Sequence, residues 1–244
     1  MWKFGFLFLV ILFAIAPNIT SIQLPDYMKK CGLKDPELNK CIIEHANDAI
    51  PVLVKGDDIL GIPILSPVII PKIDLYDGDF RLDLSNVTFD NFKDFIMTDI
   101  HFDIKEKESD FVLKSKYMKF AAKYAIKDGQ ILTRSISGNG KFLMTLVNNT
   151  IRYKVNVATY EKNGEKHIRR SNPELKLESE RGFYYFENIL SVDEGMEDVN
   201  IYLQEHWEEV QRKTQPGIEK FILKYIELVL SAVNDNVPVK EIFL

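Results

Sequence analysis

Histidines and acidic residues are the first side chains in this 244-residue chain that could support catalysis or metal binding. The four histidines are His45, His101, His167 and His206, and they are widely separated in the sequence. His206 stands among three glutamates in EHWEE, but the H-E-x-x-H arrangement that places two zinc-binding histidines on one helix face is absent. A lone histidine on a helix is more often a surface or core residue, so this stretch does not predict a metal site.

Two other patterns that carry catalysis in many enzymes are incomplete here. The chain has no G-x-S-x-G nucleophile elbow. The segment SGNGK at 137–141 has two glycines and a lysine, but it lacks the spacing of a phosphate-binding loop and the hydroxyl residue after the lysine. We interpret it as a hairpin turn. We therefore expect no catalytic residue, no metal and no cofactor, and we do not expect an enzyme.

The beginning of the chain has the pattern of a secretory signal peptide. Lys3 precedes the apolar run 4–16, which is too short to span a bilayer comfortably, and a small residue follows. We expect cleavage near Ser21, with residues 1–21 as the signal peptide and 22–244 as a secreted, extracellular protein. A membrane anchor is the alternative interpretation. No second long apolar run follows, so we expect a soluble mature protein without stable membrane insertion.

Both cysteines, Cys31 and Cys41, lie near the start of the mature chain. In an oxidising compartment such a pair favours a disulfide over a redox site. The spacing is not C-x-x-C, and no further cysteines complete a zinc site. A bridge closing so short a loop contributes about 3 kcal/mol or slightly less in the chain-entropy model. A reactive thiol is the alternative, with His45 as the nearby basic partner.

Three N-x-[S/T] sequons fit a secreted protein and start at Asn18, Asn86 and Asn148. Asn18 would leave with the signal peptide, so Asn86 and Asn148 are the expected glycosylation sites. Without residues 1–21 the chain has 30 basic and 36 acidic residues, a net charge of −6. An acidic chain without a basic cluster argues against nucleic acid and against an anionic membrane surface as the main partner.

The apolar pattern divides the mature chain into three parts. With Asp35 as cap and Pro36 at the first position, a helix is expected through Ile50, and Pro51 should end or bend it. Five glycines and prolines between 56 and 71 predict edge segments and turns. Residues 72–190 alternate as strands separated by turn signals at 128–130, 137–140 and 161–167, which predicts an antiparallel meander.

The third part, 196–234, is helical, with a wide apolar stripe that resumes after Thr214 and Pro216, where we expect a kink. So apolar a helix needs a large surface to cover it, and the strand region is the candidate. At 46% hydrophobic residues the chain can form a sizeable core, which excludes simple disorder. The pattern predicts an α+β fold in which a curved antiparallel sheet wraps a long helix. A flat sheet with the helix on one face fits the pattern equally well.

A resemblance to a known family rests on segments in a fixed order along nearly the whole mature chain. They are C-x9-C with LNKC, GIPILSPVIIPKIDL, LSNVTFDNFKDF, GNGKF, VNIYLQEHW, QPGIEKFI and VNDNVP. Together they resemble the takeout / juvenile hormone-binding protein family of secreted insect proteins. The resemblance implies a single domain over 22–244 with a tubular lipid-binding (TULIP-like) fold. It also implies a disulfide between Cys31 and Cys41.

The family resemblance implies a carrier that binds one elongated hydrophobic molecule, an isoprenoid, juvenile hormone-like or fatty-acid-like, in an internal tunnel. The alternatives are a secreted interaction module with a filled core, acting on a receptor or another protein, and a sequestering role. We expect the tunnel to be lined by apolar and tyrosine side chains, with the tyrosines supplying a hydroxyl to the ligand. The expected lining residues are Phe120, Tyr124, Phe142, Met144, Tyr153, Val155, Phe221, Ile222 and Tyr225.

Two features depart from the family pattern. Before the long helix this chain has ILSVDEG at 189–195 where the family usually has LFNG. Juvenile hormone carriers typically have a second disulfide, and this chain has no cysteines for it. Both features favour the broader takeout-like branch over a true juvenile hormone carrier.

Overall fold

The computed structural model describes residues 22–77, 80–192 and 198–244. The expected signal peptide, its Asn18 sequon and residues 193–195 of ILSVDEG therefore lie outside the described residues. The elements, in chain order, are α1 (Leu38–Leu53), β1 (Val68–Asp77), β2 (Phe80–Phe89), the 3-10 turn η1 (Phe92–Asp94), β3 (Ile96–Asp103), β4 (Glu108–Ile131), β5 (Arg134–Lys162), β6 (Glu165–Phe186), β7 (Ile189–Ser191), α2 (Val199–Glu205), α3 (Trp207–Asn236) and α4 (Val239–Ile242).

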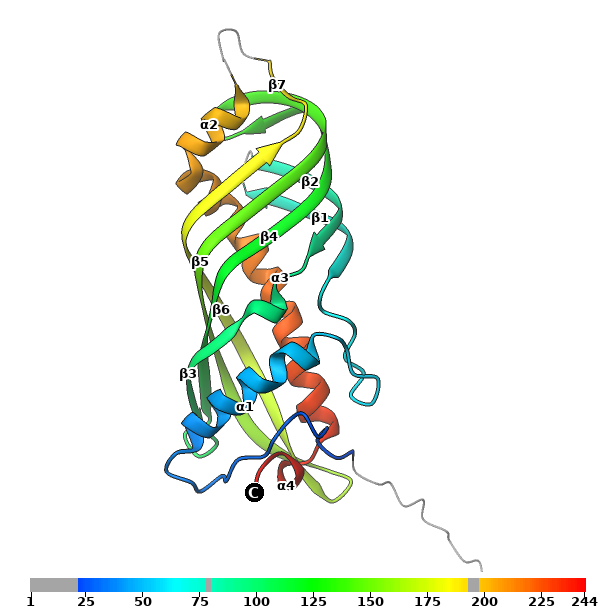
Figure 1. Ribbon diagram of the computed structural model, residues 1–244, viewed down its shortest axis with the longest axis vertical. Coiled ribbons are helices and arrows are strands. Elements are labelled where there is room, and N and C mark those ends of the chain that lie inside the picture. Colours follow the sequence, from blue (N-terminus) through cyan, green and yellow to red (C-terminus); the bar gives the residue numbers. More distant parts are fainter. Residues whose placement is uncertain (1–21, 78–79, 193–197) are drawn as a thin grey trace, which may run out of the picture.

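An antiparallel sheet of seven strands curls around the long helix α3 (Figure 1). The strand order is β1-β2-β4-β5-β6, while β3 pairs with the first part of β4 and β7 pairs with β5. Strands β4, β5 and β6 are 24, 29 and 22 residues long and run most of the length of the molecule. The sheet is curled but not closed, which confirms the predicted fold class.

Strand β5 shows why the sheet can be so long. Alternate residues face the interior, first Phe142, Met144 and Leu146, and then Ile151 and Tyr153. The inward side changes from even to odd numbers at Asn148, which has a positive φ of 51°, while the pairing register with β4 and β6 is unbroken there. β5 therefore stays one continuous strand of 29 residues although its inward side changes.

Two predicted turns are wrong. Residues 128–130 belong to β4 and residues 137–140 to β5, and the chain reverses between these strands at Leu132 instead. Gly138 and Gly140 serve close packing. A Cβ on Gly138 would lie 2.5 Å from the Asn188 carbonyl oxygen, and one on Gly140 would lie 2.7 Å from that of Glu187. The third turn is confirmed, because Asn163 and Gly164 connect β5 to β6 with positive φ angles.

The helix boundaries also differ from the prediction. The Asp35 carboxylate accepts a hydrogen bond from the Glu37 N–H in a turn, so α1 begins at Leu38. Pro51 lies in the last turn of α1, where one lost hydrogen bond is tolerated. The C-terminal helical segment breaks at His206, between α2 and α3, and α3 continues through Pro216. No helix in the described ranges is long and apolar enough to cross a membrane.

The interior of the curled sheet is filled in one half of the molecule. The first half of α3 buries Val210, Thr214, Ile218 and Ile222 against the strands. Beside them lies a group of closely packed rings. Phe89 and Phe120 have centroids 4.6 Å apart, Phe221 lies 5.6 Å from Phe120, and Phe142 lies 4.6 Å from Phe186. The second half of α3 is only half-buried, and it faces the site described next.

Candidate functional site

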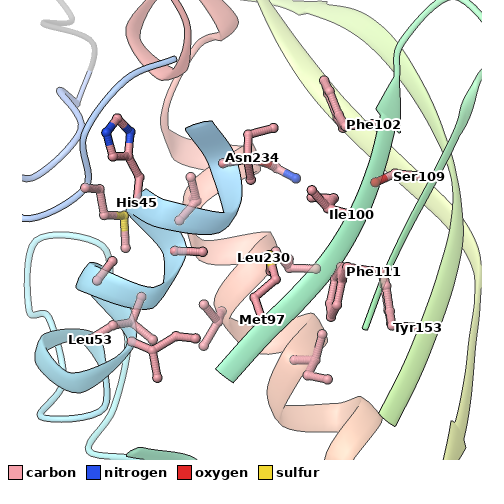
Figure 2. A pocket seen from close by; sticks show the side chains of 18 of the residues that line it. His45, Leu53, Met97, Ile100, Phe102, Ser109, Phe111, Tyr153, Leu230 and Asn234 are labelled. Atoms are coloured by element: carbon pink, nitrogen blue, oxygen red, sulfur yellow. The ribbon is translucent and has the colours of Figure 1, made fainter. Parts of the chain in front are cut away.

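A cavity of about 370 Å³ lies in the other half of the molecule. Its walls are α1, η1, the inner face of the sheet from β3 to β6, and the second half of α3 (Figure 2). Most lining side chains are apolar. Among them are Ile42, Ala49, Ile50 and Leu53 of α1, Phe92, Phe95, Met97, Ile100, Phe111, Leu113, Val155 and Val157 of η1 and the sheet, and Tyr225, Ile226, Val229, Leu230 and Val233 of α3. Such a lining suits a hydrophobic molecule.

Helix α1 lies along the open side of the curled sheet and covers the cavity (Figure 1). The Asn47 side chain fixes it to β3. The Asn47 carboxamide nitrogen donates to the Met97 carbonyl oxygen at 2.9 Å, and the Met97 N–H donates to Asn47 Oδ1 at 2.7 Å. The Asn47 side chain thus bonds to both the N–H and the carbonyl of Met97, as the backbone of a neighbouring strand would. α1 is therefore held in a defined position over the cavity.

The N-terminal segment and the end of the chain meet at one end of the cavity. Cys31 forms a disulfide with Cys41 of α1, which confirms the predicted pairing. Cys31 also pairs with Phe243, and its carbonyl oxygen accepts a hydrogen bond from the Leu244 N–H at 2.9 Å. The disulfide thus joins α1 to the two terminal segments that border the cavity.

His45 of α1 lies beside this disulfide. Its Nδ1 is 3.3 Å from the Cys31 sulfur and 3.5 Å from the Cys41 sulfur. These three side chains are the group in the described ranges with metal-ligand atoms close together. Because the sulfurs are bonded to each other they offer no thiolate, so neither a reactive thiol nor a thiolate metal site is present in this state.

A polar group interrupts the apolar wall. The Tyr153 hydroxyl donates to Glu227 of α3, and Nη2 of Arg170 lies 3.3 Å from the Glu227 carboxylate and donates to the Ser231 hydroxyl at 2.8 Å. The Arg170 side chain is 7% exposed. Burial, and then the hydrogen bond to Glu227, raise the pKa of Tyr153. Burial also raises the pKa of Tyr225. Both phenols are therefore neutral hydrogen-bonding groups at physiological pH.

The structure brings three of the nine expected lining residues to the cavity, namely Tyr153, Val155 and Tyr225. The other six are buried in the filled half and do not line this cavity, and they are Phe120, Tyr124, Phe142, Met144, Phe221 and Ile222. The Tyr124 hydroxyl donates a hydrogen bond to the Glu187 carbonyl oxygen at 2.6 Å, and the Tyr153 hydroxyl donates one to Glu227. Contact of any of the nine with a ligand stays a prediction.

Sequence reasoning did not identify most of the lining residues. The apolar spacing of Ile42, Ala49 and Ile50 predicts one face of the first helix, and Val229 and Val233 belong to the apolar stripe of the long helix. The periodicity predicts which side chains point to the interior. It does not predict which of these side chains pack against others and which border the cavity. No sequence motif marks Arg170 and Glu227 as a pair, because they lie 57 residues apart, one on a strand and the other on a helix.

The two expected glycosylation sites lie on strands. Asn86 of β2 and Asn148 of β5 are both exposed, and both have positive φ angles. The Asn148 side chain also donates to Glu180 of β6. Both positions are accessible at the surface, and their glycosylation stays a prediction.

Comparisons with solved structures and with protein-family models agree with this architecture. Among solved structures, Takeout 1 of Epiphyas postvittana superimposes with a TM-score of 0.77 and 18% sequence identity, and the match covers 88% of this chain and 98% of that one. At that identity the likeness establishes the fold. Comparison with curated proteins gives no match. The model of the haemolymph juvenile hormone binding protein family matches residues 7–244. The chain therefore belongs to the haemolymph juvenile hormone binding protein family.

Proposed function

We propose that the protein is a secreted carrier that binds one elongated hydrophobic molecule in the cavity between α1, the sheet and α3. The single observation that carries the proposal is the apolar cavity of about 370 Å³. Its volume is within the range of about 300–1,000 Å³ usual for small-molecule sites. Membership of a family named for juvenile hormone binding supports the same class of ligand, an isoprenoid or a fatty-acid-like chain. The proposal includes no catalytic step.

The energy of such binding is sufficient without any specific polar contact. Burying about fifteen methylene-sized groups yields roughly 12 kcal/mol at ~0.8 kcal/mol for each. Association and ordering cost at least ~4 kcal/mol. The difference is at most roughly 8 kcal/mol, which corresponds to a dissociation constant of about 1 μM or weaker and is suitable for a carrier that must also release its ligand.

The decisive experiment is native mass spectrometry of protein purified from a eukaryotic secretory host, followed by organic extraction and uptake of added isoprenoids and fatty acids. We expect one hydrophobic molecule per chain. Replacing Val229 on the cavity wall, Val229→Trp, fills the space and should weaken uptake at least about tenfold. The matched control is Leu143→Trp, because Leu143 is exposed on the outer face of β5.

A second candidate function is supported by the filled half of the molecule and by the outer face above it. Leu143 of β5 pairs with Tyr185 of β6, and Phe183 lies two residues away on the same face. All three are 45–47% exposed. An exposed apolar group of this kind is typical of an interaction surface. If the folded protein takes up no hydrophobic molecule and Val229→Trp changes nothing, the interaction module becomes the better explanation.

A further inference from the structure

Three polar side chains from three elements border the same part of the cavity. They are Ser109 of β4, Arg170 of β6 and Asn234 of α3. On the strand between β4 and β6, Val155 pairs with Ser109 and Val157 pairs with Arg170, so the two polar residues flank one short stretch of β5. Figure 2 shows Ser109 and Asn234 on opposite walls of the cavity. The site therefore has a polar region within an apolar enclosure.

These side chains retain hydrogen-bonding capacity. The Arg170 Nε is buried and has no partner, although Nη2 of the same guanidinium is bonded. Ser109 is 7% exposed and lines the cavity, and its hydroxyl makes no hydrogen bond among the described residues. Asn234 is half-buried, and its carboxamide has no hydrogen-bond partner within the described ranges. The backbone carbonyl oxygen of Asn234 lies 3.2 Å from Nδ1 of His167. Buried polar atoms are normally paired, and an acceptor on a ligand in the cavity would supply the partner that Arg170 Nε lacks.

The charge in this region is already balanced. The Glu227 carboxylate accepts a hydrogen bond from the Tyr153 hydroxyl and lies 3.3 Å from the Arg170 guanidinium. A ligand carboxylate would place a second negative charge beside Glu227 in a poorly solvated space, which is unfavourable. The other cation bordering the cavity, Lys29, is paired with Asp48 at the surface at 2.8 Å. An uncharged acceptor avoids this cost and still accepts hydrogen bonds.

We propose that Arg170, Ser109 and Asn234 form the site for the polar end of the ligand, and that this end is an uncharged hydrogen-bond acceptor such as an ester, ketone or aldehyde. Glu227 is the specificity-determining residue, because its carboxylate neutralises the Arg170 guanidinium, which would otherwise attract the carboxylate of a ligand. The inference rests on the proposed function, and it adds the chemical class of the ligand and the residues that select it.

The test compares three probes with the same alkyl chain, namely methyl palmitate, palmitic acid and hexadecane. Their affinities are measured near neutral pH by displacement of a fluorescent apolar probe. We expect the ester to bind at least about tenfold more tightly than either the acid or the hydrocarbon. In Glu227→Gln the guanidinium is no longer neutralised, so the acid should gain at least about tenfold while the ester changes little.

A variant without the pair tests the role of Arg170. In the double variant Arg170→Met with Glu227→Gln, no buried charge is left unpaired, and the ester should bind no better than hexadecane. Arg169→Met is the matched control, because Arg169 is the neighbouring arginine on the exposed side of β6. If circular dichroism shows that the double variant does not fold, the near-isosteric Ser109→Ala takes its place and should reduce the ratio of ester to hydrocarbon affinity.

The outcomes separate this inference from the proposed function. Binding of the acid as tightly as the ester by the native protein overturns the inference, and so does equal binding of ester and hydrocarbon. In either case the cavity still binds a hydrophobic molecule and the carrier function stands. If none of the three probes binds to the folded protein, it is the carrier function that fails.

Discussion

At the scale of the residue, Tyr124 shows how a polar group is accommodated in the filled half. Its ring packs against Phe186 with centroids 4.9 Å apart, and its hydroxyl donates to the Glu187 carbonyl oxygen at 2.6 Å. Burial, and then the negative charge of Glu187, raise the pKa of Tyr124 to about 12. The folded state therefore favours the neutral phenol more strongly than the unfolded state does, whose tyrosine pKa is about 10.

We expect Tyr124→Phe to remove both a hydrogen bond and a pH dependence. At neutral pH the variant should lose about 1 kcal/mol of unfolding free energy. The stabilisation due to the raised pKa is complete below about pH 10 and is lost as the pH rises toward 12. The fall in stability over that range should be smaller in Tyr124→Phe than in the native protein, as measured by urea unfolding.

Tyr185 provides the control for the tyrosine prediction. It lies on β6, which β5 separates from β4 in the sheet, and it is 47% exposed on the outer face. Tyr185→Phe should retain the native pH profile. If both variants and the native protein lose stability equally between pH 10 and 12, the phenol of Tyr124 does not contribute as described.

At this scale the sequence was informative about burial and less so about contact with a cavity. Eight of the nine expected lining residues are buried and the ninth, Tyr225, is half-buried. This agreement arises because strand alternation and helical spacing indicate which side chains point inward. Only Tyr153, Val155 and Tyr225 border the cavity. Whether an inward side chain meets another ring or empty space depends on contacts between distant segments, such as the ring of Phe221 with that of Phe89.

At the scale of the element, α1 is the part of the molecule whose attachment matters most for the cavity. The two hydrogen bonds of Asn47 to Met97 hold it against β3. Asn47→Ala should lower the unfolding free energy by about 2 kcal/mol, because both backbone groups of Met97 lose a partner. A bound hydrophobic molecule should also dissociate faster, as followed by stopped-flow fluorescence.

The control for α1 is Asn39→Ala, since Asn39 is exposed on the same helix. It should leave both stability and dissociation rate near the native values. Equal dissociation rates for Asn47→Ala and the native protein would mean that α1 does not govern access to the cavity.

The link between β6 and β7 makes a second prediction for an element. Gly138 of β5 passes so close to this link that an added Cβ would lie 2.5 Å from the Asn188 carbonyl oxygen. Gly138→Ala should therefore cost about 2 kcal/mol of unfolding free energy. Gly32→Ala is the control, because its Cβ would have its nearest neighbour at 3.4 Å. Equal unfolding midpoints for the two variants in urea would contradict this close packing.

Elements were predicted well in type and less well at their ends. The strand region and the long helix follow from period-2 and period-3.6 spacing. The glycines of 137–140 were assigned to a turn because local composition does not distinguish a glycine that reverses the chain from one that admits a neighbouring strand. The break at His206 was missed because neither Gly nor Pro marks it, whereas Pro216, a strong local signal, is accommodated within α3.

At the scale of the whole molecule, ligand binding and folding stability are linked. A hydrophobic molecule at about 100 times its dissociation constant should stabilise the folded state by about 2.7 kcal/mol. For a domain of this size the midpoint of thermal unfolding should rise by roughly 5–10 °C. Differential scanning calorimetry with and without methyl palmitate measures the shift. Val229→Trp, which should bind at least about tenfold more weakly, should show at most about half of this shift, and an equal shift in that variant would place the ligand elsewhere.

The overall arrangement was the part most accessible from the sequence. A helix with so wide an apolar stripe needs a surface to cover it, and the only such surface was the strand region. The choice between a wrapped and a flat sheet came from the family resemblance, because curvature depends on features such as the positive φ of Asn148, which composition does not reveal. The division into a filled and a hollow half was not predicted at all.

The order of the elements along the chain has a consequence for biosynthesis. The ribosome makes β6, which ends at Phe186, about fifty residues before the end of α3 at Asn236. At about 5–20 residues per second the apolar inner face of the sheet stays uncovered for several seconds. The nascent chain thus passes through a state with an exposed interior, which is covered only when α3 packs against the sheet at the end of synthesis.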